Sequence, residues 1–154
     1  MAEQPLILCY DGSEPSKHAL ATAPALFAPR PSLVLTVWQT LNSLPTFGWM
    51  GAGAGMADIN VVEIDQVARS RTEELAAQGV EVARQAGLDA TPLAVAAHGP
   101  IWEAIVDTAD QRDAAAIVLG SRGLTGVKNV LLGSVSEGVV RHSRRPALVV
   151  HPPE

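Results

Sequence analysis

Short, uninterrupted apolar runs alternate along this chain with longer segments in which apolar and polar residues mix. The apolar runs are Pro5 to Tyr10, Leu33 to Trp38, Pro92 to Ala97, Ala114 to Leu119 and Ala147 to Val150. An apolar run without polar alternation is typical of a strand that is covered on both faces, as in a parallel sheet. The pattern therefore predicts five buried strands.

The segments between these runs carry apolar residues at helical spacing. They predict helices over Ser16 to Phe27, over Asp58 to Gly87, from Gly99-Pro100 onward, and from Ser134 to about Ser143. Pro24 lies inside the first helix and is expected to kink or shorten it near Leu20. Gly87 is suited to end the second helix, and Pro100 to occupy the first position of the third.

The same spacing predicts which side chains face the core. They are Ile64, Val67, Ala68, Leu75, Val82 and Ala86 in the second helix, Ile101, Ile105, Val106 and Ala109 in the third, and Val135, Val139 and Val140 in the fourth. Leu41 to Ala57 fits neither a strand nor a helix. This segment is rich in glycine, which indicates a flexible loop beside the second strand.

Strands and helices thus alternate through the whole chain, which indicates parallel β-α-β units with right-handed crossovers. The predicted fold class is α/β, a three-layer sandwich around a five-stranded parallel sheet with strand order 3-2-1-4-5. No linker interrupts the pattern, so residues 1–154 are assigned to a single domain. In doubly wound folds of this kind, ligands bind beyond the carboxyl ends of the strands.

Composition and charge exclude several classes of function. Of the 154 residues, 47% are hydrophobic and 18% are charged, which suits one domain with a sizeable core and excludes a disordered chain. A formal net charge of −5 and an aromatic content of 4% argue against nucleic-acid binding. Cys9 is the single cysteine, so it cannot form an internal disulfide. No apolar run approaches about 20 residues, and we expect a cytoplasmic protein without membrane contact.

The most informative segment lies between the fourth strand and the last helix. It contains glycine, two residues, a second glycine, nine residues and then Gly-Ser, at positions Gly120, Gly123, Gly133 and Ser134. Glycines allow backbone N–H groups to turn toward an anion, and the helix that begins near Ser134 adds its dipole and free N–H groups. The side chains of Arg122, Ser134 and Ser136 can donate further hydrogen bonds. The segment therefore predicts a cradle for a polyphosphate.

Structural roles compete with ligand binding at some of these positions. Asp11, in the Asp-Gly-Ser sequence after the first strand, is placed to contact a ligand, but it also fits a helix cap. Ser134 and Glu137 have the spacing of a capping box, and Gly120 fits an ordinary turn at a strand end. The segment is neither a Walker A loop nor a dinucleotide-binding fingerprint, because the required spacings are absent.

The glycine spacing resembles the signature of universal stress proteins of the nucleotide-binding type. The segment ILCYDGSEPSKHAL is similar to the family's first strand, which ends in Asp-Gly-Ser, and VVRHSRRPALVVHP is similar to its last helix and strand. The resemblance covers nearly the whole chain and is weakest over residues 41–57. It implies the flavodoxin-like, adenine-nucleotide-hydrolase-like form of the predicted sandwich.

The resemblance also implies ATP or a related adenine nucleotide as ligand, together with Mg²⁺ (or Mn²⁺). It places Asp11 at the nucleoside end and Val37 beside the base. The positions implied at the ribose and phosphates are Leu119, Gly120, Arg122, Gly123, Gly133, Ser134, Val135 and Ser136. No catalytic residue is assigned. No metal site built from side chains alone is expected either, because the four histidines lack metal-ligand spacing.

Several functions remain open at this point. The first is a nucleotide-dependent stress-response or signalling module with at most slow ATP hydrolysis, and the alternative is a slow ATPase or phosphotransfer enzyme at the same site. A relative that adenylates substrates is disfavoured, because its Ser-Gly-Gly-x-Asp-Ser loop is absent after the first strand. A partner-binding module with an empty pocket is not excluded. The short apolar strand Ala147 to His151, at the expected sheet edge, predicts a homodimer through that edge.

Overall fold

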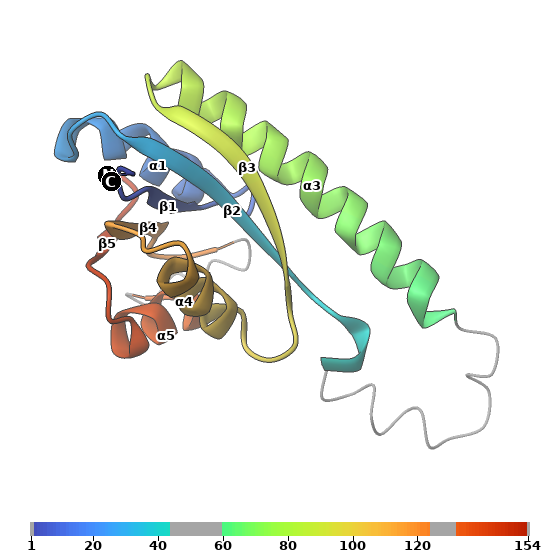
Figure 1. Cartoon of the computed structure of the whole chain (residues 1–154). Coiled ribbons are helices and arrows are strands. Elements are labelled where there is room, and N and C mark those ends of the chain that lie inside the picture. Colours follow the sequence, from blue (N-terminus) through green and yellow to red (C-terminus); the bar gives the residue numbers. More distant parts are fainter. Residues whose placement is uncertain (1, 44–59, 124–131, 154) are drawn as a thin grey trace.

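Parallel strands form the central layer of the protein, and helices cover both of its faces (Figure 1). The computed structural model describes residues 2–43, 60–123 and 132–153. The strands are β1 (Leu6–Cys9), β2 (Pro31–Gln39), β3 (Asp89–Ala97), β4 (Ala116–Gly120) and β5 (Ala147–Val150). The helices are α1 (Glu14–Leu26), the 3-10 helix η1 (Leu41–Ser43), α3 (Val61–Gln85), α4 (Ile101–Gln111) and α5 (Ser134–His142). Most of the predicted loop at 41–57 lies outside the described residues.

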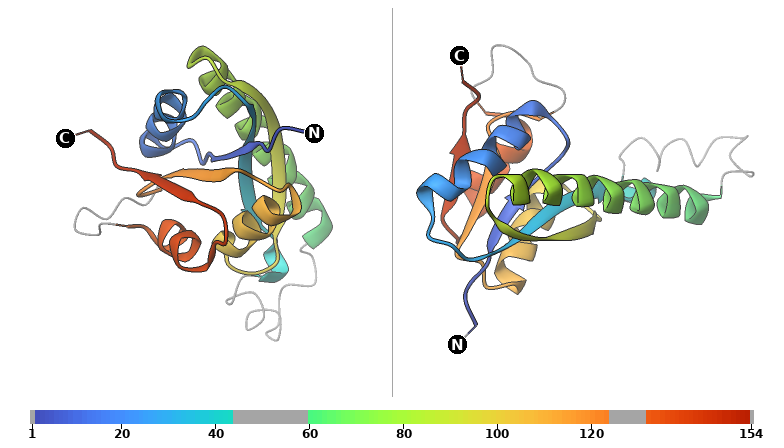
Figure 2. Two further views of the ribbon diagram at one scale, coloured as in Figure 1. Left: turned by 60° about the vertical axis from the view of Figure 1, so that its left-hand side comes forward. Right: turned by 90° about the horizontal axis from the view of Figure 1, so that it is seen from above.

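The sheet has the order β3-β2-β1-β4-β5, and every neighbouring pair is parallel, as the sequence predicts. β1 is the central strand, and its Ile7 pairs with Leu33 of β2 on one side and Ile117 of β4 on the other. Figure 2 shows α1 and α3 on one face of the sheet and α4 and α5 on the other. Because β1 and β4 are parallel neighbours, their carboxyl ends lie side by side at the same end of the sheet.

Two hydrophobic cores explain why the strands read as uninterrupted apolar runs. Leu6 and Leu8 of β1 face α1 and α3, whereas Ile7, between them, faces α4 and α5. All three side chains are fully buried. Because both faces of the sheet are covered, both sets of alternating positions are mainly apolar.

Helix α1 continues through Pro24 to Leu26, so the predicted shortening near Leu20 is wrong. Proline removes one backbone donor from the helix. The flanking Leu20 and Ala23 are fully buried against the sheet, and this packing holds the last turn in place.

Helix α3 ends as the sequence predicts. Gly87 has a φ of +95°, and its amide donates to the carbonyl of Arg84 (2.9 Å), while the amide of Leu88 donates to that of Ala83 (3.0 Å). This is a Schellman motif, in which glycine accepts the left-handed conformation. Helix α3 begins at Val61, because Asn60 has an extended backbone and caps the helix by accepting a hydrogen bond from the amide of Glu63; the predicted start at Asp58 is therefore wrong.

Some side chains predicted to face the core lie at the surface. Ile64 and Val67 are 42% and 48% exposed, because the N-terminal half of α3 extends beyond the other helices (Figure 2). Val140 of α5 is 49% exposed, whereas Val139 is fully buried. Pro100 precedes α4 as its N-terminal cap instead of forming its first residue.

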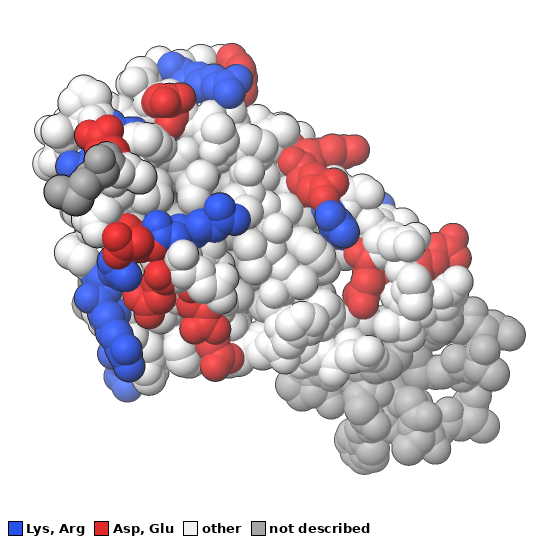
Figure 3. Space-filling view, in the orientation of Figure 1, with Lys and Arg blue, Asp and Glu red and all other residues white. Residues whose placement is uncertain are grey.

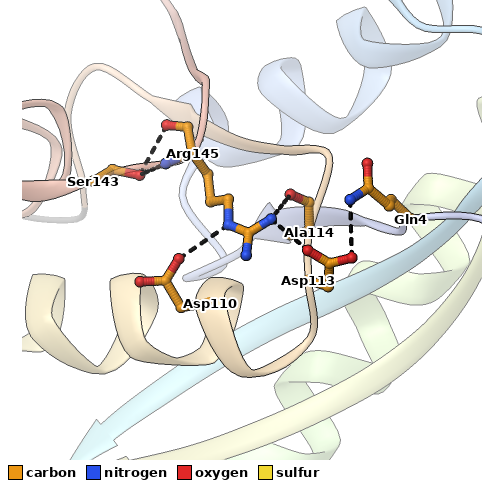
Figure 4. Close-up of polar contacts among 6 residues, drawn as sticks. All are labelled: Gln4, Asp110, Asp113, Ala114, Ser143 and Arg145. Atoms are coloured by element: carbon orange, nitrogen blue, oxygen red, sulfur yellow. Dashed lines mark hydrogen bonds and ion pairs between the residues drawn. The ribbon is translucent and has the colours of Figure 1, made fainter.

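At the amino-terminal end of the strands, hydrogen bonds of Arg145 join the start of β5 to the end of α4 (Figure 4). The guanidinium of Arg145 donates to Asp110 (3.0 Å), to Asp113 (2.7 Å) and to the carbonyl of Ala114 (3.2 Å). Gln4 donates to the second oxygen of Asp113 (2.9 Å). These hydrogen bonds from Gln4 and Arg145 lower the pKa of the Asp113 carboxyl. Arg145 is thus committed to structure, at the end of the sheet away from the candidate site.

Candidate functional site

A pocket of about 250 Å³ opens at the carboxyl ends of β1 and β4, beside the first turn of α5. Its lining includes every residue that the sequence proposed for the site: Asp11, Val37, Leu119, Gly120, Arg122, Gly123, Gly133, Ser134, Val135 and Ser136. Six further residues also line it: Cys9, Tyr10, Ser16, Leu35, Ile101 and Ile105. The fold therefore brings together side chains that are more than a hundred positions apart in the sequence.

The glycine-containing segment closes on itself at the mouth of the pocket. The amide of Gly133 donates to the carbonyl of Ser121 (2.7 Å), and the amide of Ser121 donates to the carbonyl of Val150 in β5 (3.0 Å). These bonds anchor both ends of the segment, of which residues 124–131 lie outside the described part. Residues on both sides of 124–131, such as Gly123 and Gly133, therefore line the same pocket.

Gly120 and Gly123, at the start of the segment, lack space for a side chain for two different reasons. A Cβ on Gly120 would lie 2.9 Å from the backbone of Pro15 in α1, so this glycine permits close helix-to-strand packing. A Cβ on Gly123 would lie 2.8 Å from Oδ2 of Asp11, inside the pocket. The absence of a side chain at Gly123 therefore keeps open the space between the loop and the Asp11 carboxylate.

Asp11 has one oxygen committed to structure and one directed to the pocket. Its Oδ1 accepts hydrogen bonds from the amide of Ser13 (2.9 Å) and from the Ser13 hydroxyl. Ser13, not Asp11, caps α1, since its hydroxyl oxygen accepts from the amide of Ser16 (3.3 Å). Oδ2 faces Gly123 and receives no hydrogen bond from any described residue. Asp11 can therefore both support the cap and contact a ligand.

The start of α5 differs from the predicted capping box. Gly133 is the N-terminal cap and Ser134 is the first helical residue, so the Ser134 hydroxyl makes no capping hydrogen bond and is exposed. The box fails because Ser134 lies one position too far along the helix. The Ser136 hydroxyl donates to the carbonyl of Gly120 (2.7 Å), which fixes the helix against the end of β4. The amides of Ser134, Val135 and Ser136, in the first turn of α5, have no intrahelical acceptor, and all three residues line the pocket.

The inner part of the pocket is apolar. It is lined by Val37 and Leu35 of β2 and by Ile101 and Ile105 of α4. The sequence assigned the two isoleucines to the core, and Ile105 is indeed only 3% exposed. Helical spacing identifies such residues as inward-facing, but it cannot separate those that line a cavity from those that fill the core.

Cys9, at the end of β1, contributes its thiol to this apolar part. Burial, followed by the negative charge of Asp11, raises the pKa of the Cys9 thiol to about 12. A thiol with so high a pKa stays protonated at neutral pH and is a poor nucleophile. Cys9 is therefore a small apolar wall residue and not a catalytic thiolate.

We predict that iodoacetamide alkylates Cys9 in the folded protein at least about tenfold more slowly at pH 7.5 than in the urea-unfolded chain. The raised pKa of the thiol lowers its thiolate fraction in the folded protein, and the thiolate is the form that reacts. Mass spectrometry of timed aliquots measures the rate, and the unfolded chain is the control. Equal rates in the two states would contradict the assigned environment.

The charges of the pocket suit an anion with a bound cation. Arg122 is the one Lys or Arg side chain among the described lining residues, and Asp11 is the one carboxylate. The described residues contain no group of three or more His, Cys, Asp or Glu side chains that could hold a metal ion by themselves. Arg122 and the N-terminus of α5 together favour a negatively charged group at the mouth.

The fold and the pocket define a doubly wound α/β domain with a ligand site at the carboxyl edge of its sheet. The model of the universal stress protein family matches residues 4–151, nearly the whole chain. The chain belongs to the universal stress protein family, as its glycine signature indicates. In the described residues no helix has the length and apolar character needed to cross a membrane.

Curated relatives agree with this family. Universal stress protein YxiE of Bacillus subtilis is 26% identical over 94% of this chain and 97% of its own length. Universal stress protein Rv1996 of Mycobacterium tuberculosis is 31% identical over 94% of this chain, which spans only 47% of that relative. Universal stress protein MJ0531 of Methanocaldococcus jannaschii is 44% identical over 50 residues, which are 32% of this chain and 29% of that protein.

Solved structures share the fold at low sequence identity. The structure of protein MJ0577 matches with a TM-score of 0.67 and 23% identity, covering 100% of this chain and 99% of that one. A universal stress protein from Archaeoglobus fulgidus in complex with dAMP has a TM-score of 0.63 at 21% identity, over 97% and 98% of the two chains. Another universal stress protein, in complex with cAMP, has a TM-score of 0.60 at 24% identity, over 98% of each chain.

Proposed function

We propose that this protein binds an adenine nucleotide, ATP with Mg²⁺ (or Mn²⁺), in the pocket at the carboxyl edge of the sheet. The observation that carries the proposal is the pairing of an anion cradle with an apolar cavity in one pocket. A nucleotide has the matching two parts, a charged phosphate chain and a flat base. Relatives of the same fold in complex with dAMP and with cAMP support an adenine ligand.

The phosphates are assigned to the mouth of the pocket. The amide of Gly123 and the first-turn amides of α5, at Ser134, Val135 and Ser136, provide hydrogen-bond donors that require no charged side chain. Arg122 adds a charge-assisted hydrogen bond, and the exposed hydroxyl of Ser134 adds a neutral one. The family signature at the same positions supports this assignment.

The base is assigned to the apolar part. Val37, Leu35 and Ile101 offer apolar contacts against which a purine ring can be buried. Asp11 lies at the junction of the apolar and charged parts, where its Oδ2 can accept a hydrogen bond from a ribose hydroxyl or approach a metal. Leu119, Val135 and Ser136 complete the wall between the two parts.

A divalent cation fits this site only together with the nucleotide. Mg²⁺ in nucleotide sites is held by one or two carboxylates, by water and by the phosphates. Asp11 is the one described carboxylate in the lining, and its Oδ2 is directed to the pocket. When bound, the metal would neutralise phosphate charge; the chain's own part is to orient the phosphates and present that oxygen.

The biological role proposed is that of a nucleotide-dependent stress-response or signalling module of the cytoplasm, with at most slow ATP hydrolysis. Fast phosphoryl transfer needs a group that positions the attacking nucleophile and a cation that stabilises the transition state. The described lining offers Asp11, already bonded to Ser13, and Arg122. A slow ATPase or phosphotransfer activity at the same site is the second candidate, favoured by Oδ2 of Asp11 facing the phosphate cradle.

Isothermal titration with ATP and Mg²⁺ tests the proposal. Replacing Arg122 by alanine is expected to weaken ATP binding about tenfold through loss of one charge-assisted hydrogen bond, while adenosine binding stays unchanged. Arg71→Ala, which removes the same charge from the exposed side of α3, is the control and should bind ATP normally. Absence of binding heat for the unmodified protein at high concentration would refute the proposal.

We also propose a homodimer formed through β5, the short outer strand of the sheet. Its Ala147 is exposed and Leu148 and Val149 are half-buried, so pairing with a second copy would cover apolar surface and the free edge. Light scattering at micromolar concentration is expected to give twice the mass of one chain. A mass of one chain would contradict this assignment without affecting the nucleotide site.

A further inference from the structure

The other edge of the sheet, β3, is open over most of its length. No strand pairs with its outer side within residues 2–43, 60–123 and 132–153. The amide of Thr40 donates to the carbonyl of Ala97 (3.2 Å), so the backbone polar groups of Ala97 face the sheet. Because these groups alternate in direction along a strand, Ala94 and Ala96 direct theirs outward. The backbone of Pro92 points outward in the same way, so the missing N–H of proline removes no hydrogen bond to β2.

A groove of about 310 Å³ lies between the end of β3 and the outer side of α4. Ala96 and Ala97 line it on the strand side. Side chains alternate between the two faces of a strand, so Ala97 lies on the α4 face with Val95, and Ala96 borders the groove with its backbone. Glu103 and Asp107 line it on the helix side. These two residues are one helical turn apart, so both carboxylates are presented along the same wall.

The wall from α4 is negatively charged. Glu103 and Asp107 are exposed, and none of the ion pairs among the described residues involves either of them. Figure 3 shows acidic side chains in a row over α4, with basic side chains beside the upper end of the row and a mostly uncharged surface farther along β2 and β3. A free strand edge next to two unpaired carboxylates thus presents backbone hydrogen-bonding groups and negative charge together.

We propose that this groove binds an extended, cationic peptide segment of a partner protein, which adds a strand to β3. The backbone of the segment pairs with Ala94 and Ala96, the mode known as β-strand addition. Its alternate side chains lie on the α4 side, where lysine or arginine reaches Glu103 and Asp107. Backbone pairing supplies affinity, and the two carboxylates select for positive charge.

A second copy of this chain is a poorer occupant of the same edge. It would bring its own Glu103 and Asp107 toward the interface. Like charges at an interface disfavour association. The groove shares no lining residue with the nucleotide pocket, so the proposal stands or fails independently of nucleotide binding.

Fluorescence anisotropy with a labelled synthetic peptide tests the proposal on the full chain. The probe is a fluorescein-labelled peptide of roughly eight residues that alternates lysine and valine, long enough to span the open part of β3. The control peptide carries glutamate in place of lysine. We expect the lysine peptide to bind with an affinity that falls as salt is raised, and the glutamate peptide not to bind.

Two variants separate the two parts of the groove. The double variant Glu103→Gln with Asp107→Asn is expected to weaken binding of the lysine peptide about fivefold. Its control, Glu74→Gln with Glu81→Gln, removes the same charge from α3 and should leave binding unchanged. Ala96→Pro removes one outward donor without touching the β2 ladder, and it should also weaken binding about fivefold.

The outcomes are distinct. Lack of binding by the lysine peptide, equal binding of both peptides, or unchanged binding by Glu103→Gln with Asp107→Asn would overturn the proposal. A dimer in light scattering that Ala96→Pro dissociates would also overturn it, since a second copy would then occupy the edge. If Ala96→Pro fails to fold, the charge variants, which replace exposed side chains, still decide the question.

Discussion

Replacing Gly123 by valine is expected to weaken ATP binding at least about 100-fold, which corresponds to about 2.7 kcal/mol, with little change in stability. A Cβ at this position would lie 2.8 Å from Oδ2 of Asp11. Asp11 is not free to turn away, because its Oδ1 holds the amide and hydroxyl of Ser13. The valine side chain would therefore fill the space proposed for the phosphates and metal. Gly123 itself is exposed, so the core is not disturbed.

Isothermal titration measures this effect, and Gly99→Val provides a matched control. A Cβ on Gly99 would lie 2.9 Å from a carboxylate oxygen of Glu103, which is the same kind of crowding. Gly99 lies outside the lining of the nucleotide pocket. We expect the Gly99 variant to bind ATP as the unmodified protein does. Normal ATP binding by the Gly123 variant would show that the nucleotide does not pass this loop.

Replacing Gly138 by alanine is expected to lower the free energy of unfolding by about 2–3 kcal/mol. A Cβ on Gly138 would overlap Cγ and Cδ1 of Trp102 and lie 2.7 Å from its Cβ. Trp102 has little freedom to withdraw, since its ring stacks on His142 with centroids 4.3 Å apart. The intrinsic gain of about 0.5–1 kcal/mol from alanine in a helix is smaller than this overlap. Helices α4 and α5 must therefore separate.

Urea unfolding followed by circular dichroism measures the change in stability. Val140→Ala, on the same helix at a position that is 49% exposed, is the control and should shift the free energy of unfolding by less than about 0.5 kcal/mol. An unchanged midpoint for the Gly138 variant would contradict the close packing of α5 on Trp102. The experiment also reports on the pocket, because α4 and α5 form two of its walls.

The topology could be predicted from the sequence because each strand is apolar on both faces. Leu6 and Ile7 belong to different cores, yet both positions require the same residue type. That requirement distinguishes a buried parallel strand from one exposed on one side. The alternation of strands and helices and the rule of right-handed crossovers predict a doubly wound parallel sheet. These two features allow more than one strand order, and the order 3-2-1-4-5 is the one that goes with the fold implied by the family resemblance.

The surface of the helices was predicted less well, since periodicity identifies a face but not what covers it. Ile64 and Val67 lie on a plausible apolar stripe, but α3 extends beyond the elements that could bury them. Val140 adjoins the buried Val139 in the sequence and lies on the outer side of α5. The cap of α5 was displaced by one residue because Gly133, which has no side chain to signal a cap, takes that position.

The charged part of the pocket could be predicted from the sequence, whereas its apolar part could not be separated from the core. Glycine spacing marks a backbone that must approach something closely, and Gly123 beside Asp11 fits that expectation. Ile101 and Ile105 carry no such mark, because a residue that lines a buried cavity looks like one that fills it. The contribution of Cys9 depends on where β1 ends relative to α4, which only the folded chain defines.

Amide NMR of the ¹⁵N-labelled protein during titration with ATP and Mg²⁺ tests most directly whether the nucleotide binds in this pocket. We predict saturable shifts of the amides of Gly120, Gly123 and Gly133, and none at Gly87, which lies at the far end of α3. Glycine amides occupy a separate region of the spectrum and are readily followed. Saturable shifts confined to residues outside the pocket, or no shifts at millimolar ATP, would contradict the proposed site.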